Sequence, residues 1–473
     1  MNRFHLKPLA LAATLLAACP TWTVAADVPA AVQPASAGAT PLSAITQQDG
    51  LPQVRHERYR LANGLEVILV EDHRLPLVAF NLWVHVGAAN ETPGLTGFAH
   101  LFEHLMFKST AHLKAEQFDR LTEDVGGENN AFTAEDTTAY FETVPSHHLE
   151  RLLWAEAERM STLNVDEANF HSERKVVEEE FRQRVLANPY GRLFEAIAPN
   201  GYLEHPYKRP VIGSIEDLEA ASLDDVRAFH ATYYRPDNAV LIVTGDFDPA
   251  DLDRWVDKYF GPLTHPDTPI PRVNVAEPVR EKSAQVKLTA PNVPLPAVML
   301  IWQGPKVTSD DSPALQVAQA LLSAGDSSRM NQALVYRQRV AQSAGFQADL
   351  HTDAGLLAAY AIASGQRQPQ TLVAPLMREI EALARGPIAA AELDKIKTQL
   401  LTSTLNERQT AMGRGQALGW AMIQYNDPAA VDRELQRLQA VTAADVQRVL
   451  RQYVIGRPVV TLTYTQESQG AQG

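Results

Sequence analysis

Alternation of hydrophobic and polar positions begins after residue 51 and predicts β-strands. The segment "GLEVILVED" is one such strand and "LVAFNLWVHVGA" is a second. In the second segment Phe80, Leu82, Val84 and Val86 alternate with Asn81, Trp83 and His85. A period of two residues is typical of a strand with one buried face. We therefore expect only one face of this strand to lie in a hydrophobic core.

Helical patterns follow these strands and are mixed with them along the chain. The sequence predicts helices over residues 97–108, 166–186 and 223–233, among others. The strands and helices do not alternate strictly, as they would in a doubly wound parallel sheet. This mixture predicts an α+β fold in which helices pack on a largely antiparallel sheet.

An internal repeat indicates two related halves. The segment "DVRAFHATYYRPDNAVLIVTGD" begins at Asp225, and "DVQRVLRQYVIGRPVVTLTYT" begins at Asp445, so the offset is 445 − 225 = 220 residues. Each reads as a helix, a turn and a β-branched strand. We predict two homologous domains at 51–265 and 286–473, arranged as two halves around a cleft and joined by a Pro-rich linker at 266–285. The alternative is chance similarity between two short helix–turn–strand units.

The amino-terminal residues indicate export. Arg3 and Lys7 precede the apolar run "PLALAATLLAAC", which is too short to span a bilayer. We predict a signal peptide at 1–26, followed by a flexible linker at 27–50, and a periplasmic location. Alternatively, "LAAC" resembles a lipoprotein box that would leave Cys19 lipidated as a membrane anchor. Because Cys19 is the only cysteine, the mature domains have no disulfide and no thiolate metal ligand.

The charge of the chain bears on its partners. The formal net charge is −14, with 45% hydrophobic and 21% charged residues. Nucleic-acid binding depends on a basic excess that neutralises phosphates, and this chain has none. We therefore expect no nucleic-acid partner.

The segment "GFAHLFEHLMFK" carries the strongest chemical signal. His100 and His104 are one helical turn apart, so their imidazoles share a face and can bind one Zn²⁺. Glu103 lies beside them, which gives the order H-x-x-E-H. The alternative is a pair of structural histidines.

A catalytic zinc site needs a third ligand from another element. Glu173 and Glu180 are two turns apart in a predicted helix, and Val176 and Val177 between them suggest that this face points inward. We expect the neighbouring carboxylates to be solvated. The alternative is an exposed acidic helix paired with its own basic residues; the residues concerned are Glu178, Glu179, Arg174, Lys175 and Arg182.

These motifs resemble the pitrilysin/insulinase family of inverted-motif zinc metallopeptidases, and in size the chain is similar to the bacterial and mitochondrial-processing-peptidase beta branch. The likeness extends through "RLANGLEVILVED", "GGENNAFTAEDTTAYFETVP", "HPYKRPVIG" and "YYRPDNAVLIVTGD". The resemblance implies a metalloendopeptidase with one Zn²⁺ per chain, acting on peptides or unfolded proteins. It implies that His100, His104 and Glu180 bind the metal, that Glu103 is the general base, and that Glu173 orients a ligand. It also implies that an edge strand containing Asn130, Ala131 and Phe132 binds the substrate.

The second half departs from the family pattern. The 220-residue offset places the histidine motif on Ala320–Ala324 and Glu180 near Leu400, so the metal ligands are absent there. Many members also carry an arginine and a tyrosine in this half that contact the substrate, and here those positions hold Val335 and Gln342. Tyr336 and Arg337 are adjacent but in a different register. We therefore expect a homologous, metal-free partner subunit that supplies the missing pair.

Two other functions compete with the peptidase. The resemblance also covers members that became structural subunits, although these usually lose motif residues that this chain keeps. A serine hydrolase is a second alternative, but the sequence has no G-x-S-x-G elbow.

Overall fold

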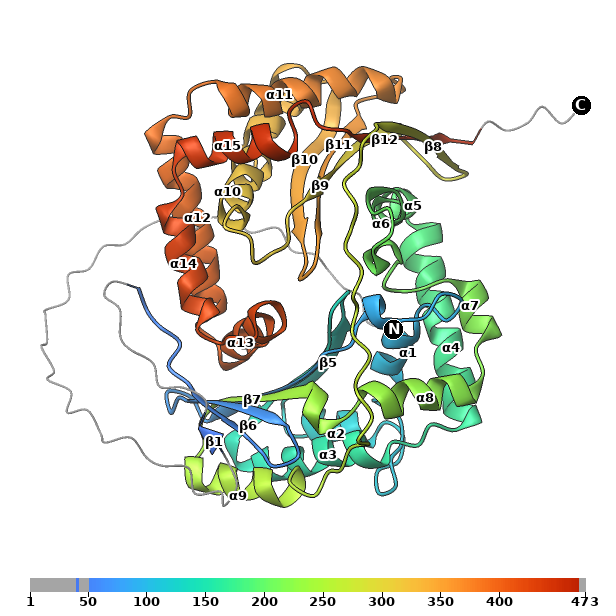
Figure 1. The fold of residues 1–473 in the computed structure, drawn as a ribbon, viewed down its shortest axis with the longest axis vertical. Helices are drawn as coiled ribbons and strands as arrows, with labels where there is room; N and C mark the ends of the chain where they lie inside the picture. The colour runs from blue at the N-terminus through green and yellow to red at the C-terminus, as the bar shows by residue number, and fades with distance from the viewer. Residues whose placement is uncertain (1–39, 42–50, 468–473) are drawn as a thin grey trace, which may run out of the picture. The chain divides into compact units, whose positions relative to one another are not determined.

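The computed structural model describes residues 40–41 and 51–467, and its strands form two sheets (Figure 1). The predicted signal peptide, Cys19 and most of the predicted linker at 27–50 lie outside the described residues. In spatial order, the first sheet consists of β1 (Thr40–Pro41), β2 (Glu57–Arg60), β3 (Glu66–Glu71), β7 (Ala239–Gly245), β4 (Leu77–Val84), β6 (Thr138–Pro145) and β5 (Glu128–Thr133). The second consists of β10 (Ala341–Leu350), β11 (Gly355–Ala363), β9 (Ala297–Gly304), β12 (Val460–Gln466) and β8 (Ala284–Ala290).

Helices pack on both sheets. Those of the first half are α1 (Phe98–Leu105), α2 (Gln117–Glu123), α3 (Leu149–Thr162), α4 (Glu167–Phe181), α5 (Gly191–Glu195), α6 (Ile197–Gly201), α7 (Ile215–Ala220), α8 (Leu223–Tyr233) and α9 (Pro249–Tyr259). Those of the second half are α10 (Ser312–Ser323), α11 (Val373–Arg385), α12 (Ala390–Glu407), α13 (Ala411–Tyr425), α14 (Ala430–Ala440) and α15 (Ala443–Tyr453). Within the described ranges, none of these helices is long and apolar enough to cross a membrane.

The two sheets repeat one topology, which confirms the predicted relation between the halves. The order β3–β7–β4–β6–β5 in the first sheet corresponds to β8–β12–β9–β11–β10 in the second. In each, one parallel pair, β3 with β7 or β8 with β12, is followed by antiparallel pairs. The repeated helices α8 and α15 begin at equivalent capping boxes, Ser222 with Asp225 and Thr442 with Asp445. Chance similarity does not explain two identical strand orders, and the α+β, largely antiparallel fold is confirmed.

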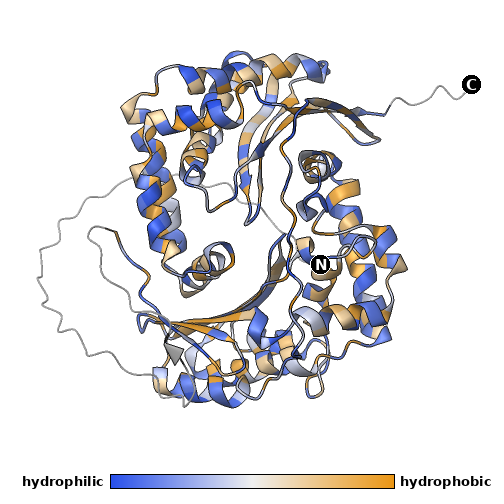
Figure 2. Cartoon of the chain, in the orientation of Figure 1, coloured by the Kyte–Doolittle hydropathy of each residue, from blue (hydrophilic) through white to orange (hydrophobic). Residues whose placement is uncertain are grey.

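Each half covers one face of its own sheet. In the first half, α1, α3, α8 and α9 bury their apolar residues against one face. In the second half, α10, α11, α12 and α15 do the same. Figure 2 shows the central strands of the first sheet as predominantly hydrophobic, in agreement with their burial.

The other face of the first sheet is covered by α13 from the second half, so the prediction of a single buried face on β4 is wrong. Asn81 and Trp83, which point away from the first core, are fully buried. Trp83 packs edge-on against Trp420 of α13, with ring centroids 5.3 Å apart. The strand alternation could not reveal this second layer because its helix lies more than 300 residues away in the sequence.

The other face of the second sheet is covered in return by the first half. Leu193 of α5, together with Tyr202 and Tyr207 after α6, joins the apolar cluster formed by the outer face of β9, β11 and β12. A Cβ atom on Gly201 would lie 2.4 Å from the Leu356 side chain, so the absence of a side chain at Gly201 allows α6 to pack closely on this sheet. Adding the 220-residue offset to Gly191 gives 191 + 220 = 411, the first residue of α13. The segment that begins at Gly191 and its equivalent in the repeat, α13, therefore each cover the sheet of the opposite half.

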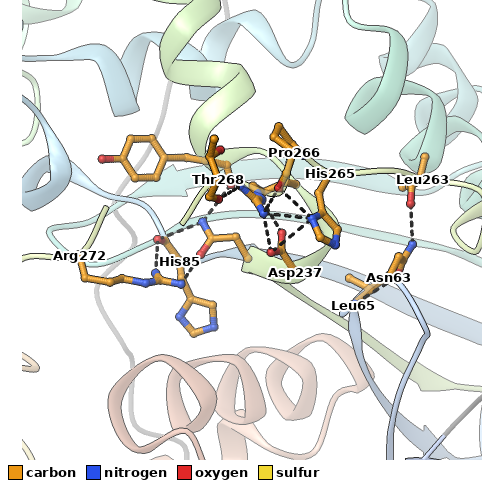
Figure 3. Close-up of polar contacts among 12 residues, drawn as sticks. Asn63, Leu65, His85, Asp237, Leu263, His265, Pro266, Thr268 and Arg272 are labelled. Carbon is orange, nitrogen blue, oxygen red and sulfur yellow. Dashed lines mark hydrogen bonds and ion pairs between the residues drawn. The ribbon is translucent and has the colours of Figure 1, made fainter. Parts of the chain in front are cut away.

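The segment predicted as a linker, 266–285, is bound along its length. The Arg235 guanidinium donates to the carbonyl oxygens of Pro266 and Thr268 at 2.7 and 2.8 Å, and Arg272 donates to Asn238 Oδ1 at 2.8 Å (Figure 3). Further along, the Glu277 carboxylate accepts from the backbone N–H groups of residues 203–205. The segment is largely without helix or strand until β8 begins, yet hydrogen bonds fix its path.

The close approach of α13 to the first sheet generates a stability prediction. A Cβ atom on Gly419 would lie 1.9 Å from the Trp83 ring. Helix propensity alone predicts that Gly419→Ala stabilises α13 by about 1 kcal/mol. Packing predicts the opposite sign, a loss of about 1–3 kcal/mol through overpacking. We expect urea denaturation to show a net destabilisation of about 1 kcal/mol. Gln416→Ala on the same helix is the control and should change stability by less than about 0.5 kcal/mol; a Gly419→Ala protein more stable than wild type would contradict the packing.

Candidate metal centre and substrate strand

Helix α1 carries the histidine motif on a rigid base. Phe98, Leu101, Phe102 and Leu105 are buried in the core of the first half, which leaves the polar residues of the helix on one side. The helix begins after Gly97, whose φ of +90° and close contact with the Ile212 carbonyl oxygen suit glycine alone.

A buried carboxylate caps the amino terminus of α1. Glu91 accepts hydrogen bonds from the N–H groups of Gly97 and Ala99, each at 2.9 Å. Burial raises the pKa of Glu91 to about 8, although these N–H groups oppose the shift. Glu91 therefore satisfies amides that the helix itself leaves unpaired. Sequence reasoning missed it because it lies seven residues before the first residue of the helix.

Helix α4 presents Glu173 and Glu180 toward α1. Its first turn is capped by Asp166, which accepts from the Asn169 N–H group at 2.8 Å. Glu173 is buried and Glu180 is largely buried, so this face points inward. Val177 is also buried, but Val176 is 45% exposed, so only one of the two valines marks the inward face.

The expectation that Glu178 is solvated is wrong. It is 8% exposed and lies between two arginines of its own helix, with contacts of 3.8 Å to Arg174 and 3.1 Å to Arg182. Glu179 is exposed, as expected. The intrahelical pairing suggested as an alternative therefore exists, but on a different face from that of Glu173 and Glu180.

Three side chains from α1 and α4 converge. Glu180 Oε2 lies 3.5 Å from His100 Nε2 and 3.3 Å from His104 Nε2. Ligands bound tetrahedrally at about 2.0–2.1 Å from one ion lie about 3.3–3.4 Å apart, so these separations fit a shared metal. One ligand atom from each residue lies within 4.8 Å of the others, and within the described ranges this is the group of His, Cys, Asp and Glu able to hold a metal ion. No comparable group occurs in the described part of the second half.

Glu103 lies at the edge of this group. Its Oε2 is 4.0 Å from His100 Nε2 and accepts a 2.7 Å hydrogen bond from the Thr133 hydroxyl. Burial raises the pKa of Glu103, and the Thr133 hydrogen bond partly opposes the shift. Thr133 belongs to β5, so it joins the carboxylate of α1 to the edge strand. The motif gave no indication of this contact.

Further contacts fix the ligands. Glu173 Oε2 lies 3.6 Å from His104 Nδ1, and its Oε1 lies 2.8 Å from the Lys108 ammonium. Arg184 pairs with Glu180 Oε1 at 2.6 Å, which leaves Oε2 facing the histidines. Arg184 lies in a π-helical turn, Arg182–Ala187, directly after α4. Sequence reasoning missed both cations, although Lys108 lies one helical turn beyond His104 and could have been found by that spacing.

The two histidines differ in their affinity for protons. Burial and the neighbouring His104 lower the pKa of His100 to about 4. Burial also opposes protonation of His104, but Glu173 and Glu180 outweigh it and raise its pKa to about 9. Despite burial, the contacts with His104 and nearby cations lower the pKa values of both carboxylates. At neutral pH the metal-free His104 is therefore protonated and, with Lys108 and Arg184, faces the two carboxylates.

The predicted substrate strand lies at the edge of the first sheet. Strand β5 pairs with β6 on one side and ends the strand order on the other. Asn130 Oδ1 accepts a 2.8 Å hydrogen bond from the Ala131 N–H group. The Phe132 ring packs against both Trp83 and Trp420, with ring centroids 5.4 and 5.5 Å away. Asn130, Ala131 and Phe132 thus form an edge whose position depends on α13.

The positions at which an arginine and a tyrosine were expected lie in the second half. Val335 lies in a π-helical segment, Asn331–Arg337, and Gln342 is exposed on β10. Tyr336 is 49% exposed. Arg337 lies near Glu379 of α11: burial raises the pKa of Glu379, and the positive charge of Arg337 partly opposes this rise. Arg337 is thus paired with a carboxylate of the second half.

Known proteins match nearly the whole of this arrangement. A family model described as Insulinase (Peptidase family M16) matches residues 66–214, and one described as Peptidase M16 inactive domain matches residues 220–400. The zinc protease PqqE of Helicobacter pylori is 31% identical over 401 residues, which cover 84% of this chain and 90% of that protein. A probable mitochondrial-processing peptidase subunit beta of Arabidopsis thaliana is 23% identical, and the alignment covers 84% of this chain and 76% of that protein.

Solved structures agree with these sequence matches. The crystal structure of a protease from Helicobacter pylori has a TM-score of 0.83 and 30% identity, with 87% of this chain and 99% of that chain covered. A structure of a peptidase M16 inactive domain from Pseudomonas fluorescens has a TM-score of 0.78 at 17% identity, and this second match shows the fold alone. Sequence, fold and the group of convergent ligands agree: the chain belongs to the insulinase family of peptidases, family M16.

Proposed function

We propose that this protein is a zinc-dependent metalloendopeptidase that hydrolyses peptides or unfolded proteins. The observation that carries the proposal is the convergence of His100, His104 and Glu180 at the separations of one tetrahedral ion, with Glu103 beside them. Relatives named as zinc proteases support the choice of metal. A structural subunit derived from the same family is the alternative, and the complete set of ligands argues against it.

The proposed chemistry divides between the metal and the protein. Bound Zn²⁺ would supply a Lewis acid for the attacking water and the scissile carbonyl. Two imidazole Nε2 atoms and Glu180 Oε2 would hold it. Glu103 would accept the proton of the attacking water on its free carboxylate and deliver it to the leaving amine. Its raised pKa suits a group that must both take up and release a proton.

The substrate would bind as an added strand. Strand β5 is an edge, so its outward N–H and C=O groups can pair with an extended peptide. Thr133 of this strand contacts the proposed base, which would place the added backbone near the metal ligands. The positions Asn130, Ala131 and Phe132 would form the central part of this contact.

We propose in addition that a homologous, metal-free subunit completes the enzyme. The expected arginine and tyrosine positions are occupied by Val335 and Gln342, and Arg337 lies near Glu379. One relative is named as a subunit of a processing peptidase, which supports an assembly of this kind. The basic and apolar residues before Ala26 support export to the periplasm, either as a soluble protein or anchored through Cys19.

Metal dependence tests the proposed activity. The purified chain, with any subunit that co-purifies, should contain about one zinc per chain and cleave a quenched peptide until a chelator is added. Glu103→Gln should keep the zinc and lower kcat by about 10²–10⁴-fold, because only the proton acceptor is lost. The exposed Glu179→Gln is the matched control and should retain both zinc and activity. Native turnover by the pure Glu103→Gln protein would remove Glu103 from the mechanism.

Proton release tests the ligand assignment independently of activity. The pKa of about 9 keeps His104 protonated at pH 7, and only its neutral form can bind zinc. Zinc uptake should therefore release about one proton, and affinity should fall by about tenfold per pH unit below 9. Calorimetry in buffers of different ionisation enthalpy measures this release. Glu173→Gln removes a group that raises the pKa of His104, so it should release less than wild type at pH 8, whereas Glu179→Gln should not differ. Equal proton release in all three proteins would contradict the assignment.

Reconstitution tests the partner. If a metal-free homologue co-purifies, the separated chain should bind zinc with unchanged affinity yet cleave peptides much more slowly, and adding the homologue should restore the rate. Full activity of the lone chain on an unfolded peptide would show that no second subunit is needed.

A further inference from the structure

The turn between β5 and β6 is held by the first half on one side. The N–H groups of Ala88 and Ala89 donate to the carbonyl oxygens of Ala134 and Glu135 at 3.1 and 2.9 Å. Gly87 permits this approach, since a Cβ atom there would lie 2.3 Å from the Ala134 oxygen. This turn begins directly after Thr133, so its position determines where the end of β5 lies.

The second half reaches the same turn through Asp136. The Tyr207 hydroxyl donates to Asp136 Oδ1 at 2.6 Å, and the Thr352 N–H group donates to Oδ2 at 3.2 Å. The Asp353 N–H group in turn donates to the Tyr207 oxygen at 3.2 Å. Thr352 and Asp353 form the turn between β10 and β11, so one carboxylate and one phenol join the turns of two different sheets.

Charge and packing support this junction. His351 Nδ1 lies 3.6 Å from Glu135 and its Nε2 lies 3.3 Å from Asp349. Burial lowers the pKa of His351, but these carboxylates outweigh it and raise it to about 9, so the imidazole is positively charged at neutral pH. The ring of Tyr207 lies 5.0 Å from that of His351 and 4.0 Å from that of the fully buried His205. The junction is therefore a partly exposed polar network anchored on the buried ring of Tyr207.

We propose that this network is a clasp through which the second half positions the substrate strand β5, with Tyr207 as its central positioning residue. The clasp comprises Asp136, Tyr207, His351, Thr352 and Asp353. Apart from its pairing with β6, β5 is held by the Asn129–Thr122 hydrogen bond near its start, by the packing of Phe132 and by the Thr133 contact at its end. Release of the following turn would loosen the strand, while Glu103 would stay in place because it belongs to α1. The inference rests on the proposed peptidase function for its kinetic consequence, but not for its structural one.

A pair of tyrosines gives a matched test. Tyr207→Phe removes the hydroxyl that bridges Asp136 and Asp353. Tyr202→Phe is the control, since Tyr202 is equally buried in the same cluster and its hydroxyl has no hydrogen-bond partner among the described residues. Each substitution removes one buried oxygen and keeps the ring.

Kinetics and hydrogen exchange provide two readouts. In the zinc-loaded protein, with its partner subunit where activity requires one, Tyr207→Phe should raise KM for an extended peptide by about 3- to 10-fold with kcat within about twofold, as expected for lost binding rather than lost chemistry. Amide exchange over residues 128–137 should accelerate at least tenfold while exchange in α1 is unchanged. Tyr202→Phe should match wild type in both measurements.

The outcomes separate the clasp from the proposed activity. Absence of metal-dependent cleavage in the wild type would refute the peptidase function, yet the exchange comparison would still decide on the clasp. Equal exchange over 128–137 in both variants would overturn the clasp even in an active enzyme. A fall in kcat at constant KM would overturn it as well, because the strand would then affect chemistry and not substrate binding.

Discussion

The exchange of covering segments between the two halves is the constraint on which the structure depends. A sheet with two apolar faces must bury both, and each half provides enough helices for only one face of its own sheet. Helix α13 covers the outer face of the first sheet, and α5 with α6 and the following loop covers that of the second. These segments occupy equivalent positions in the repeat, so the outer face of each sheet is covered in the same way by the other half. Neither half buries its sheet without the other.

This exchange also determines the geometry of the candidate metal centre. The segment that crosses to the second sheet begins at Gly191, only eleven residues after Glu180, and a π-helical turn joins it to α4. Glu180 is therefore positioned by α4, which packs in the first half, and by the following segment, which packs against the sheet of the second half. In the opposite direction, Trp420 of α13 stacks on Phe132 of the edge strand. The positions of Glu180 and of strand β5 therefore both depend on contacts between the halves.

The sequence predicts those features that depend on local periodicity and on motifs. Helix α8 was predicted with its observed bounds, and the offset of 220 residues revealed two related halves with one strand order. Helical spacing predicted that His100 and His104 share one helix face and that Glu173 and Glu180 share another. The structure brings these four residues together.

Other features escaped prediction because they depend on tertiary contacts. The second buried face of β4 depends on a helix from the other half. Thr133 contacts Glu103, and Arg184 contacts Glu180, only because an edge strand and a π-helical turn end nearby. Strand periodicity and helix spacing carry no information on such encounters.

The proton on His104 has a consequence for the order in which the protein matures. In a structural zinc domain the ion supplies the free energy of folding, and the empty polypeptide is disordered. Here hydrophobic packing holds α1 and α4 in place, and the imidazolium with its carboxylates balances the charge that an ion would otherwise neutralise. In the proposed zinc enzyme the candidate ligands would thus be preorganised before any ion binds. Loading would then exchange an ion for a proton in an already folded molecule, without a coupled folding reaction.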